Sequence, residues 1–270
     1  MRLMHLLSAG FSALLAAALP AAAADLYSPD APAPAYAPAA GFGWSGLHVG
    51  ANIGYTWGKH DWDPAKAALT AAGSGGPAGT AYFFSTDTDY DSSVIGGGQI
   101  GYNWQFHQWV IGAEADLQRQ NISNAVTLSG NTPYAGGPFV AGDTFSATTN
   151  WLGTLRARAG VALDRFLVYG TGGFAFGQVE TNACYVGGFC WSDKQIHAGF
   201  VVGAGAEFAV TSNVSLKLEY DYVDLGHESH SLGSFKNSAP SLTGTYGVSA
   251  DVDYRSHILR AGANYRFNLF

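Results

Sequence analysis

Apolar and polar residues alternate along most of this chain, and its C-terminal segment shows the pattern most clearly. Apolar side chains occupy every second position from Leu259 to Leu269, and polar or small residues lie between them: Arg260, Gly262, Asn264, Arg266 and Asn268. Successive side chains of a β-strand point to opposite faces, so this segment has one apolar and one polar face. Alternation over this length is typical of a strand that meets lipid on one side and the lumen of a barrel on the other.

The same alternation recurs between Trp44 and the C-terminus and predicts eight strands. The fifth segment is rich in glycine, and its pattern leaves open which face is which. In the other segments the apolar face is continuous and the opposite face carries amides, hydroxyls and charges. The expected strands cover residues 47–57, 99–106, 109–118, 151–161, 166–179, 196–208, 214–222 and 259–269.

The links between these segments alternate in length. Three are short, at residues 106–108, 163–165 and 211–213, and the other four are long, at residues 58–93, 120–149, 180–194 and 227–252. This asymmetry predicts an all-β fold, an eight-stranded antiparallel transmembrane β-barrel with short periplasmic turns and long extracellular loops. Tryptophans near the strand ends suit the aromatic girdles of such a barrel: Trp57, Trp104, Trp109 and Trp151. The rival fold is a soluble β-sandwich, which does not normally need alternation this long.

The N-terminus predicts export. Arg2 precedes an apolar stretch from Leu6 to Leu19, and Ala22 and Ala24 fit a cleavage site, so residues 1–24 are expected to be a signal peptide. A membrane anchor is the alternative, but the apolar run is short for a span. Residues 25–43 are rich in Pro and Ala and predict an extended periplasmic leader, with peptidoglycan binding as an alternative role. Residues 44–270 form the expected barrel.

The charge composition excludes a nucleic-acid-binding surface. The chain has 13 bases and 20 acids, and loss of Arg2 with the signal peptide leaves a net charge of −8. Nucleic-acid binding needs a basic patch instead. Charged residues make up only 12% of the chain and aromatic residues 14%, which suits strands in contact with lipid.

Ionisable residues on the polar faces of the strands are the main candidate site. They are Glu114, Asp116, Glu207, Glu219, Asp221, Arg156, Arg158, Lys217, Arg260 and Arg266. The lumen of an eight-stranded barrel is just wide enough for side chains to fill, and charges there need partners. We therefore expect a network of paired charges that plugs the lumen; a path for ions or solutes is the alternative.

The two cysteines, Cys184 and Cys190, lie in the third long link. Exported proteins fold in an oxidising compartment, so we expect a disulfide. Metal binding together with His197 is the alternative, but no second metal-ligand motif supports it. Residues 87–91 begin like a calcium loop yet lack its Gly and Glu. Ser256-His257 suggests a lipid-facing hydrolase dyad, but His257 is expected to be a girdle histidine near the rim instead. We expect no cofactor, no metal and no enzymatic activity.

Four motifs carry a resemblance to a known family. They are Ala24-Asp25-Leu26, the opening Trp44–Gly50, the stretch Tyr169–Ala175 and the ending Arg260–Phe267. The chain resembles the small porin-family or outer-membrane immunogenic proteins of alphaproteobacteria, which are similar to the OmpA-type eight-stranded barrel. The resemblance implies an abundant, often antigenic outer-membrane protein. Many relatives would end at Phe267, so either Phe267 or Phe270 is expected to be the signal for the barrel-assembly machinery.

These observations predict a protein of the cell outer membrane with a structural and surface-display role. Its expected partners are outer-membrane lipid, lipopolysaccharide and the barrel-assembly machinery, with peptidoglycan or host molecules as further candidates and no nucleic acid. Two alternative functions stay open. One is a narrow porin-like diffusion channel, and the other is a surface receptor or adhesin whose loops bind a ligand such as haem.

Overall fold

The computed structural model describes residues 42–62, 66–70, 80–82, 90–127, 141–237 and 244–267. The expected signal peptide, almost all of the leader, the calcium-like segment and Phe270 lie outside the described residues. The strands are β1 (Gly46–Trp62), β2 (Lys66–Thr70), β3 (Thr80–Tyr82), β4 (Asp91–Phe106), β5 (Trp109–Thr127), β6 (Thr144–Leu163), β7 (Phe166–Tyr185), β8 (Phe189–Ala209), β9 (Val214–Asn237) and β10 (Gly244–Phe267). No helix in these ranges is long and apolar enough to cross a membrane.

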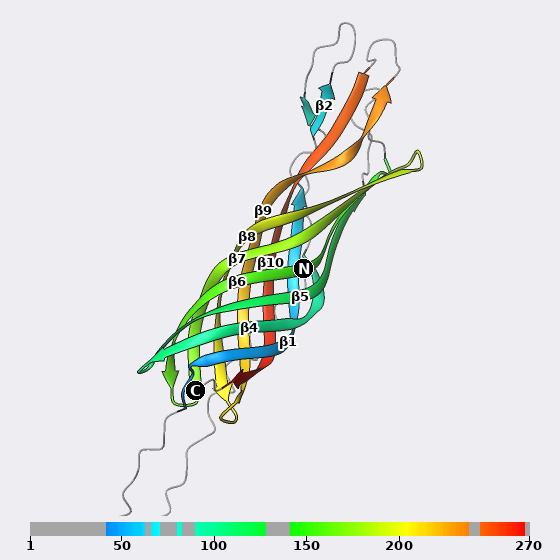
Figure 1. Cartoon of the computed structure of the whole chain (residues 1–270). Helices are drawn as coiled ribbons and strands as arrows, with labels where there is room; N and C mark the ends of the chain where they lie inside the picture. The colour runs from blue at the N-terminus through cyan, green and yellow to red at the C-terminus, as the bar shows by residue number, and fades with distance from the viewer. Residues whose placement is uncertain are drawn as a thin grey trace, which may run out of the picture. The chain divides into compact units, whose positions relative to one another are not determined.

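Eight of these strands close into an antiparallel ring (Figure 1). The ring runs β1-β4-β5-β6-β7-β8-β9-β10, and β10 pairs back with β1 from Leu47↔Phe267 to Trp62↔Val252. Closure leaves the ring without an unpaired edge, which is why a barrel can cross lipid. The short strands β2 and β3 extend the sheet from the outer end of β10. The expected eight-stranded barrel is confirmed.

Tight turns join the strands at the periplasmic end. Residues 107–108 connect β4 to β5, and residues 164–165 connect β6 to β7. The first residue of each turn, His107 and Asp164, has a positive φ, of 57° and 53°. Two-residue hairpins need such a conformation because it matches the twist of the strands.

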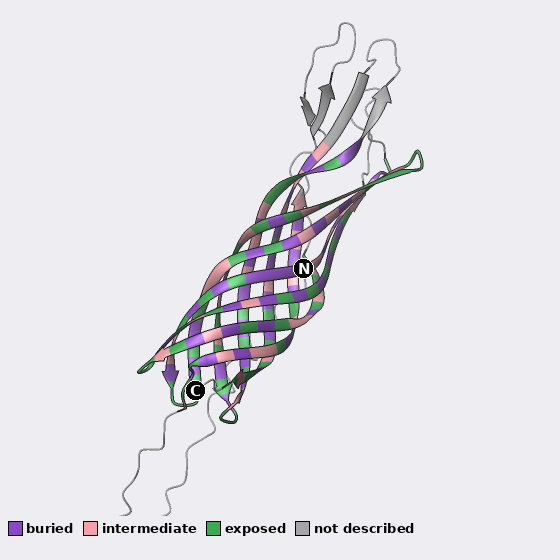
Figure 2. Cartoon of the chain, viewed as in Figure 1, coloured by how far each residue is buried: buried purple, intermediate pink, exposed green. Residues whose placement is uncertain are grey.

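Buried and exposed residues alternate along the strands of the ring, as the sequence predicts (Figure 2). On β5, Leu117 is 60% exposed whereas the neighbouring Gln118 is 2% exposed. The structure also resolves the face of the glycine-rich strand β7, where Leu167 and Tyr169 point inward and Phe174 points outward. The outward apolar side chains form a belt around the barrel.

Aromatic side chains mark the limit of this belt at its outer end, away from the periplasmic turns. Trp57 stacks on His257 with ring centroids 5.7 Å apart, and His257 also contacts Tyr220 and Tyr222. Trp151 packs edge-to-face on Phe176 on the neighbouring strand. Rings of this kind belong at a membrane–water interface.

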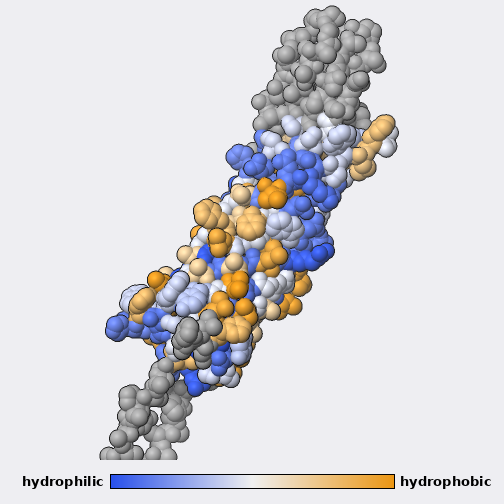
Figure 3. Space-filling model, viewed as in Figure 1, coloured by the Kyte–Doolittle hydropathy of each residue, from blue (hydrophilic) through white to orange (hydrophobic). Residues whose placement is uncertain are grey.

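The barrel wall continues beyond these aromatic residues with its polarity reversed. The outward side chains are now polar: Lys59, Asp61, Asn121, Ser123, Ser146, Thr148, Gln178, Glu180, Asn182, Lys194, Ser229, Asp251 and Asp253. Inside, a cluster of apolar side chains is fully buried: Phe145, Ala147, Val179, Ala183, Leu232, Ala250 and Val252. On the face shown in Figure 3, hydrophilic side chains gather toward this end of the barrel. This part is built like a soluble protein core and lies in water.

The reversal corrects the expected loop lengths. Residues 120–127, 144–149, 180–185, 189–194, 227–237 and 244–252 are strand, and β7 and β8 are separated by only three turn residues, 186–188. The sequence interpretation stopped each strand where its outward face became polar. The strands continue past that point because water, rather than lipid, surrounds them there.

The position of the belt can be tested on β6. The substitution Leu155→Arg, in the middle of the belt, should destabilise the barrel by about 2–4 kcal/mol, because it places a cation in hydrocarbon. The substitution Ser146→Arg, on the outward face of the water-exposed part, should change the free energy of unfolding by less than about 0.5 kcal/mol. Urea unfolding from phospholipid vesicles, followed by tryptophan fluorescence, measures both. Equal losses at the two positions would contradict the placement of the belt.

Candidate functional site: a buried charge cluster in the lumen

Arg156 of β6 lies at the centre of a buried cluster of charges inside the barrel. Its Nη2 lies 2.6 Å from Glu114 Oε1 and 2.9 Å from Asp116 Oδ2. Its Nη1 lies 2.8 Å from Glu219 Oε1 and 3.1 Å from Asp221 Oδ1. The acids come from β5 on one side and from β9 on the other, so one guanidinium joins strands that are not neighbours in the sheet.

Arg260 of β10 shares three of these acids. Its Nη2 lies 2.5 Å from Glu219 Oε1 and 3.1 Å from Asp221 Oδ2, and its Nη1 lies 3.3 Å from Asp116 Oδ1. The planar guanidinium presents several donors in a fixed geometry, which suits it to sharing carboxylates in this way. The two arginines therefore hold the carboxylates of Asp116, Glu219 and Asp221 between them.

A second group of ion pairs lies toward the periplasmic end. Lys217 Nζ lies 2.9 Å from Glu114 Oε1, and Arg158 Nη2 lies 2.8 Å from Glu207 Oε2. His48 Nε2 lies 3.2 Å from Glu114 Oε2. Glu114 thus contacts bases from both groups and links them into one cluster.

Amide side chains fill the space beside the charges. Asn264 Nδ2 donates to Glu207 Oε1 (2.9 Å), Gln99 Nε2 donates to Asn264 Oδ1 (2.8 Å), and Asn52 Nδ2 donates to Gln99 Oε1 (2.6 Å). This chain of hydrogen bonds runs from the acid on β8 to β10, β4 and β1. It closes the side of the ring at β4 and β1, strands that contribute no carboxylate, Lys or Arg to the cluster.

Two glycines of β8 make room for the cluster. A Cβ atom at Gly203 would lie 2.1 Å from Asp221 Oδ1, and one at Gly205 would lie 2.6 Å from the hydroxyl of Tyr169. That hydroxyl donates to Glu219 Oε2 (2.5 Å), and the guanidinium of Arg158 lies 4.1 Å from the centre of the Tyr169 ring. The glycines therefore let buried side chains from β7 and β9 lie directly against the β8 backbone.

Apolar layers enclose the charge cluster at both ends. Toward the outside lies a cluster of buried, mostly apolar side chains: Ile95, Ile122, Leu152, Ala175, Val201, Val223, Leu225, Tyr254 and Ile258. Toward the periplasm, the layer consists of Trp44, Val110, Ala162, Leu167, Tyr169 and Ala209. Neither layer is predicted from the sequence. The alternation pattern identifies inward positions by their polarity, so it gives no signal for inward apolar residues such as Leu152.

Trp44 closes the periplasmic end. Its backbone N–H donates to Gln105 Oε1 (2.6 Å) and its indole N–H donates to the carbonyl of Asp164 (3.2 Å). A cavity next to it, lined in part by His48, Glu207 and Ser215, has a volume of about 10 Å³. That is room for about one water molecule.

Arg266 lies apart from the cluster in which the sequence analysis included it. The residue is near the periplasmic end of β10, where its guanidinium stacks over the ring of Phe42 at 4.1 Å. Its Nη2 donates to the carbonyl of Ser212 at 2.5 Å. Alternation predicted the correct face of the strand for Arg266 but not its position along the barrel axis. At that position its neighbours are Phe42 and the turn before β9.

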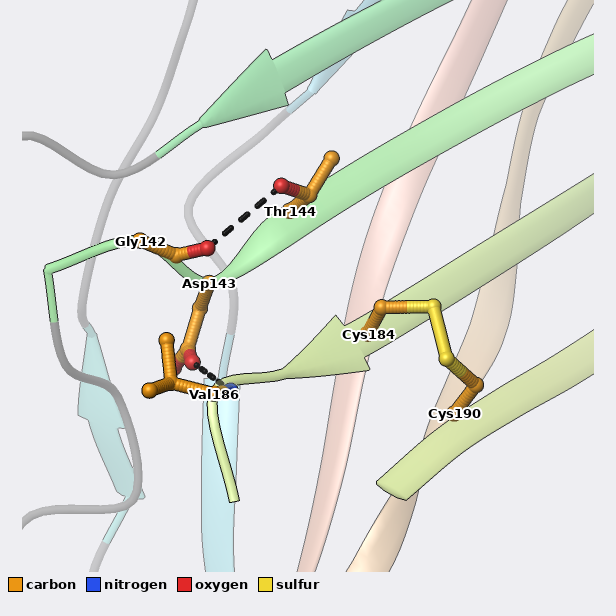
Figure 4. The surroundings of a disulfide bond; sticks show 6 residues. All are labelled: Gly142, Asp143, Thr144, Cys184, Val186 and Cys190. Atoms are coloured by element: carbon orange, nitrogen blue, oxygen red, sulfur yellow. Dashed lines mark hydrogen bonds between the residues drawn. A yellow bond between two sulfur atoms is a disulfide. The ribbon is translucent and has the colours of Figure 1, made fainter. Parts of the chain in front are cut away.

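The cysteines form a disulfide, which crosses the end of the β7–β8 hairpin (Figure 4). Cys184 and Cys190 are directly opposite each other in the strand pairing, with Cα atoms 4.1 Å apart. The adjoining turn is held by Asp143 Oδ1, which accepts a hydrogen bond from the Val186 N–H (2.8 Å). The disulfide thus constrains the outer tip of one hairpin and does not contact the charge cluster.

The other candidates occupy separate places. Ser256 is buried in the lumen whereas His257 is in the outer girdle, so the two cannot act as a dyad. Phe267 ends β10 on the outer face, 5.0 Å from the ring of Tyr265. Within the described part of the chain, no group of three or more His, Cys, Asp or Glu residues is arranged to hold a metal ion.

Comparison with known proteins agrees with this architecture. A family model described as an outer membrane protein beta-barrel domain matches residues 9–267. The chain belongs to this outer-membrane β-barrel family. The expected family is thereby confirmed, and so is its location in the cell outer membrane, in contact with lipid and lipopolysaccharide.

Individual relatives of this β-barrel family come from alphaproteobacteria. The chain is 35% identical over 256 residues to a 31 kDa outer-membrane immunogenic protein of Brucella melitensis, covering 92% of this chain and 93% of the relative. It is 35% identical over 140 residues to a 22 kDa outer membrane protein of Rhizobium leguminosarum, covering 51% and 56% of the two chains. Among solved structures, outer membrane protein OprG of Pseudomonas aeruginosa is 14% identical, with a TM-score of 0.42 and coverage of 84% and 99%.

The role of Arg156 can be tested by its removal. Arg156→Ala should lower the free energy of unfolding by about 3–5 kcal/mol, because it leaves buried carboxylates without their shared partner. Arg255→Ala is the control, since Arg255 is 45% exposed and makes a single surface pair with Asp224 at 3.4 Å. We expect that variant to lose less than about 1 kcal/mol. Urea unfolding in vesicles measures both, and a loss at Arg156 no greater than at Arg255 would refute the structural role of the cluster.

Proposed function

We propose that the protein is a structural barrel of the outer membrane whose lumen is closed and whose outer hairpins are displayed at the cell surface. The observation that carries this proposal is the filling of the lumen by the charge cluster between its two apolar layers. A barrel with such an interior stabilises itself and presents its outer end, and these functions need neither a pore nor catalysis.

The energetic argument rests on desolvation. An ion that passed through the lumen would have to separate Arg156 and Arg260 from carboxylates 2.5–3.3 Å away. Breaking a buried pair is costly, because each charge is left in a medium that solvates it poorly. The apolar layers on either side add a second barrier, since most of the side chains that they present to a permeating ion are hydrocarbon.

The display role draws on the outer part of the barrel and on the relatives. The β7–β8 hairpin projects Val186, Phe189 and Trp191 as exposed side chains beside its disulfide. The Brucella relatives are named immunogenic outer-membrane proteins, which is consistent with exposure of this end at the cell surface. We further propose that the terminal strand β10, with Phe267 near its end, is the segment that the barrel-assembly machinery recognises.

Single-channel recording of the refolded protein in planar bilayers tests the closed lumen. We expect conductance to be rare in the native protein, because the cluster and the apolar layers fill the lumen. Arg156→Ala should open more often, because it removes the side chain that ties β5, β6 and β9 together. Leu155→Ala is the matched control: it changes the neighbouring residue, which faces lipid, and should leave conductance unchanged.

A steady, large conductance from the native protein would overturn the closed lumen and favour the diffusion channel. Heat-shifted mobility on a detergent gel should accompany each recording, so that an unfolded sample is not scored as closed.

A further inference from the structure

Two buried histidines face each other in the water-exposed part of the barrel, well above the charge cluster. His197 of β8 and His230 of β9 are each 0% exposed, and their Nε2 atoms lie 2.7 Å apart. The rings are stacked, with an interplanar angle of 27°. We call these two residues the histidine pair.

A bulge in β9 aims His230 into the lumen. Asp224 pairs with Arg255 and His227 with Asp253, so β9 has one residue more than β10 across this stretch. Gly226, with φ of 64°, lies in the bulge and supplies the left-handed conformation that it needs. The bulge reverses the alternation, so that His227 points outward and His230 inward. Bulges frequently re-aim a side chain next to a functional site.

The two histidines lie beyond the aromatic girdle, since His197 pairs with Gly177, the residue that follows Phe176. Outward residues near them, such as Lys194 and Ser229, are hydrophilic. Burial, together with the nearby His230 and His60, lowers the pKa of His197 to about 4. Burial also lowers the pKa of His230, although Asp193 and Glu228 oppose that shift. Neutral imidazole is the form that binds metal ions.

The surroundings of His230 leave its Nε2 lone pair pointing at His197. Its other nitrogen, Nδ1, lies 3.5 Å from Asp193 Oδ2 and 3.1 Å from Thr181 Oγ1. An ionised carboxylate can only accept, so Asp193 favours the proton on Nδ1. Asp193 is itself held by the side chain of Gln195 and the backbone N–H of Ser231, both at 3.0 Å. A histidine whose second nitrogen faces a carboxylate is the usual arrangement around a protein-bound metal.

His197 Nε2 donates to His230 Nε2 when His230 carries its proton on Nδ1. The other nitrogen of His197, Nδ1, has no hydrogen-bond partner among the described residues. Binding of a metal ion would replace the Nε2–Nε2 hydrogen bond and move the proton of His197 to this open Nδ1.

We propose that the histidine pair binds a divalent transition-metal ion of the kind that prefers imidazole, with Cu²⁺ as the best-fitting example. Two nitrogens bound at about 2.0 Å and at right angles lie about 2.8 Å apart, close to the observed spacing. A tetrahedral ion would require about 3.3 Å and so a small separation of the rings. With two protein ligands, the remaining positions are left to water, so the ion should exchange readily.

The ion would enter at the seam between β8 and β9. Their backbone pairing ends at Phe200↔Asp224, and above that point side chains join the two strands, as in the contact of Gln195 with the Ser229 carbonyl (2.8 Å). The carboxylates of Asp193 and Glu228 lie near this seam and favour the approach of a cation. Metal binding at this site is independent of whether the lumen below it conducts ions.

Titration of the tag-free, refolded protein with Cu²⁺ at pH 7, followed by electron paramagnetic resonance, tests the proposal. We expect one site per chain whose nitrogen hyperfine pattern shows two imidazoles. His197→Gln and His230→Gln should each weaken that site by at least about tenfold. His227→Gln is the matched control on the same strand, since His227 is exposed, and it should leave the affinity unchanged.

The proposal is overturned if the native spectrum lacks two imidazole nitrogens, or if the two variants bind Cu²⁺ as tightly as the native chain. The native spectrum alone decides the matter if a variant fails to fold, as judged by heat-shifted gel mobility.

Discussion

The cost of an unpaired charge inside the lumen is the constraint on which the rest of this structure depends. Each base of the cluster contacts acids from other strands, so a one-residue shift of any strand would turn its charges out to lipid and leave its partners alone. The cluster therefore fixes the register of the ring as well as filling it. The glycines of β8 and the amides of β1, β4 and β10 serve the same requirement, since the glycines let the charges meet and Asn264, at the end of the amide chain, donates to Glu207.

The surroundings of the barrel determine the rest of the pattern. Where lipid surrounds the strands, their outward side chains are apolar and the interior holds the charges. Where water surrounds them, the outward side chains are polar and the interior holds Phe145, Leu232 and Val252. The same strands pass from one regime to the other at the aromatic girdle near Trp57 and His257. The barrel thus combines a membrane-spanning part with an outer part that has an ordinary hydrophobic core.

Much of the fold follows from the sequence because a strand in lipid has a strict period of two. That period identified the faces of seven strands, the short turns, and the inward direction of residues such as Arg156 and Glu219. It failed on β7, where Gly170, Gly172 and Gly173 carry no side chain to mark a face. It also failed beyond the girdle, where the polarity of the faces reverses, so that strands there were interpreted as loops.

The contacts within the site could not be predicted to the same extent. Alternation gives the side of a strand but not which acid meets which base across the lumen, and it included Arg266, which instead stacks on Phe42. The bulge at Gly226 is the clearest example of a local feature that alternation does not predict. A break in alternation from Leu225 to His230 signals it, but only the pairing with β10 shows that His230 turns inward to meet His197.

A double-mutant cycle on Arg158 and Glu207 tests the central claim most directly, because this pair joins β6 to β8 across the lumen at 2.8 Å. Lys194 and Glu180, 3.1 Å apart on the outer surface, form the matched control pair. With Arg158→Ala and Glu207→Gln, we expect a coupling free energy of about 1–3 kcal/mol in the lumen. We expect less than about 0.5 kcal/mol at the surface. A coupling in the lumen no larger than that at the surface would contradict the claim that buried charge pairs hold the barrel together.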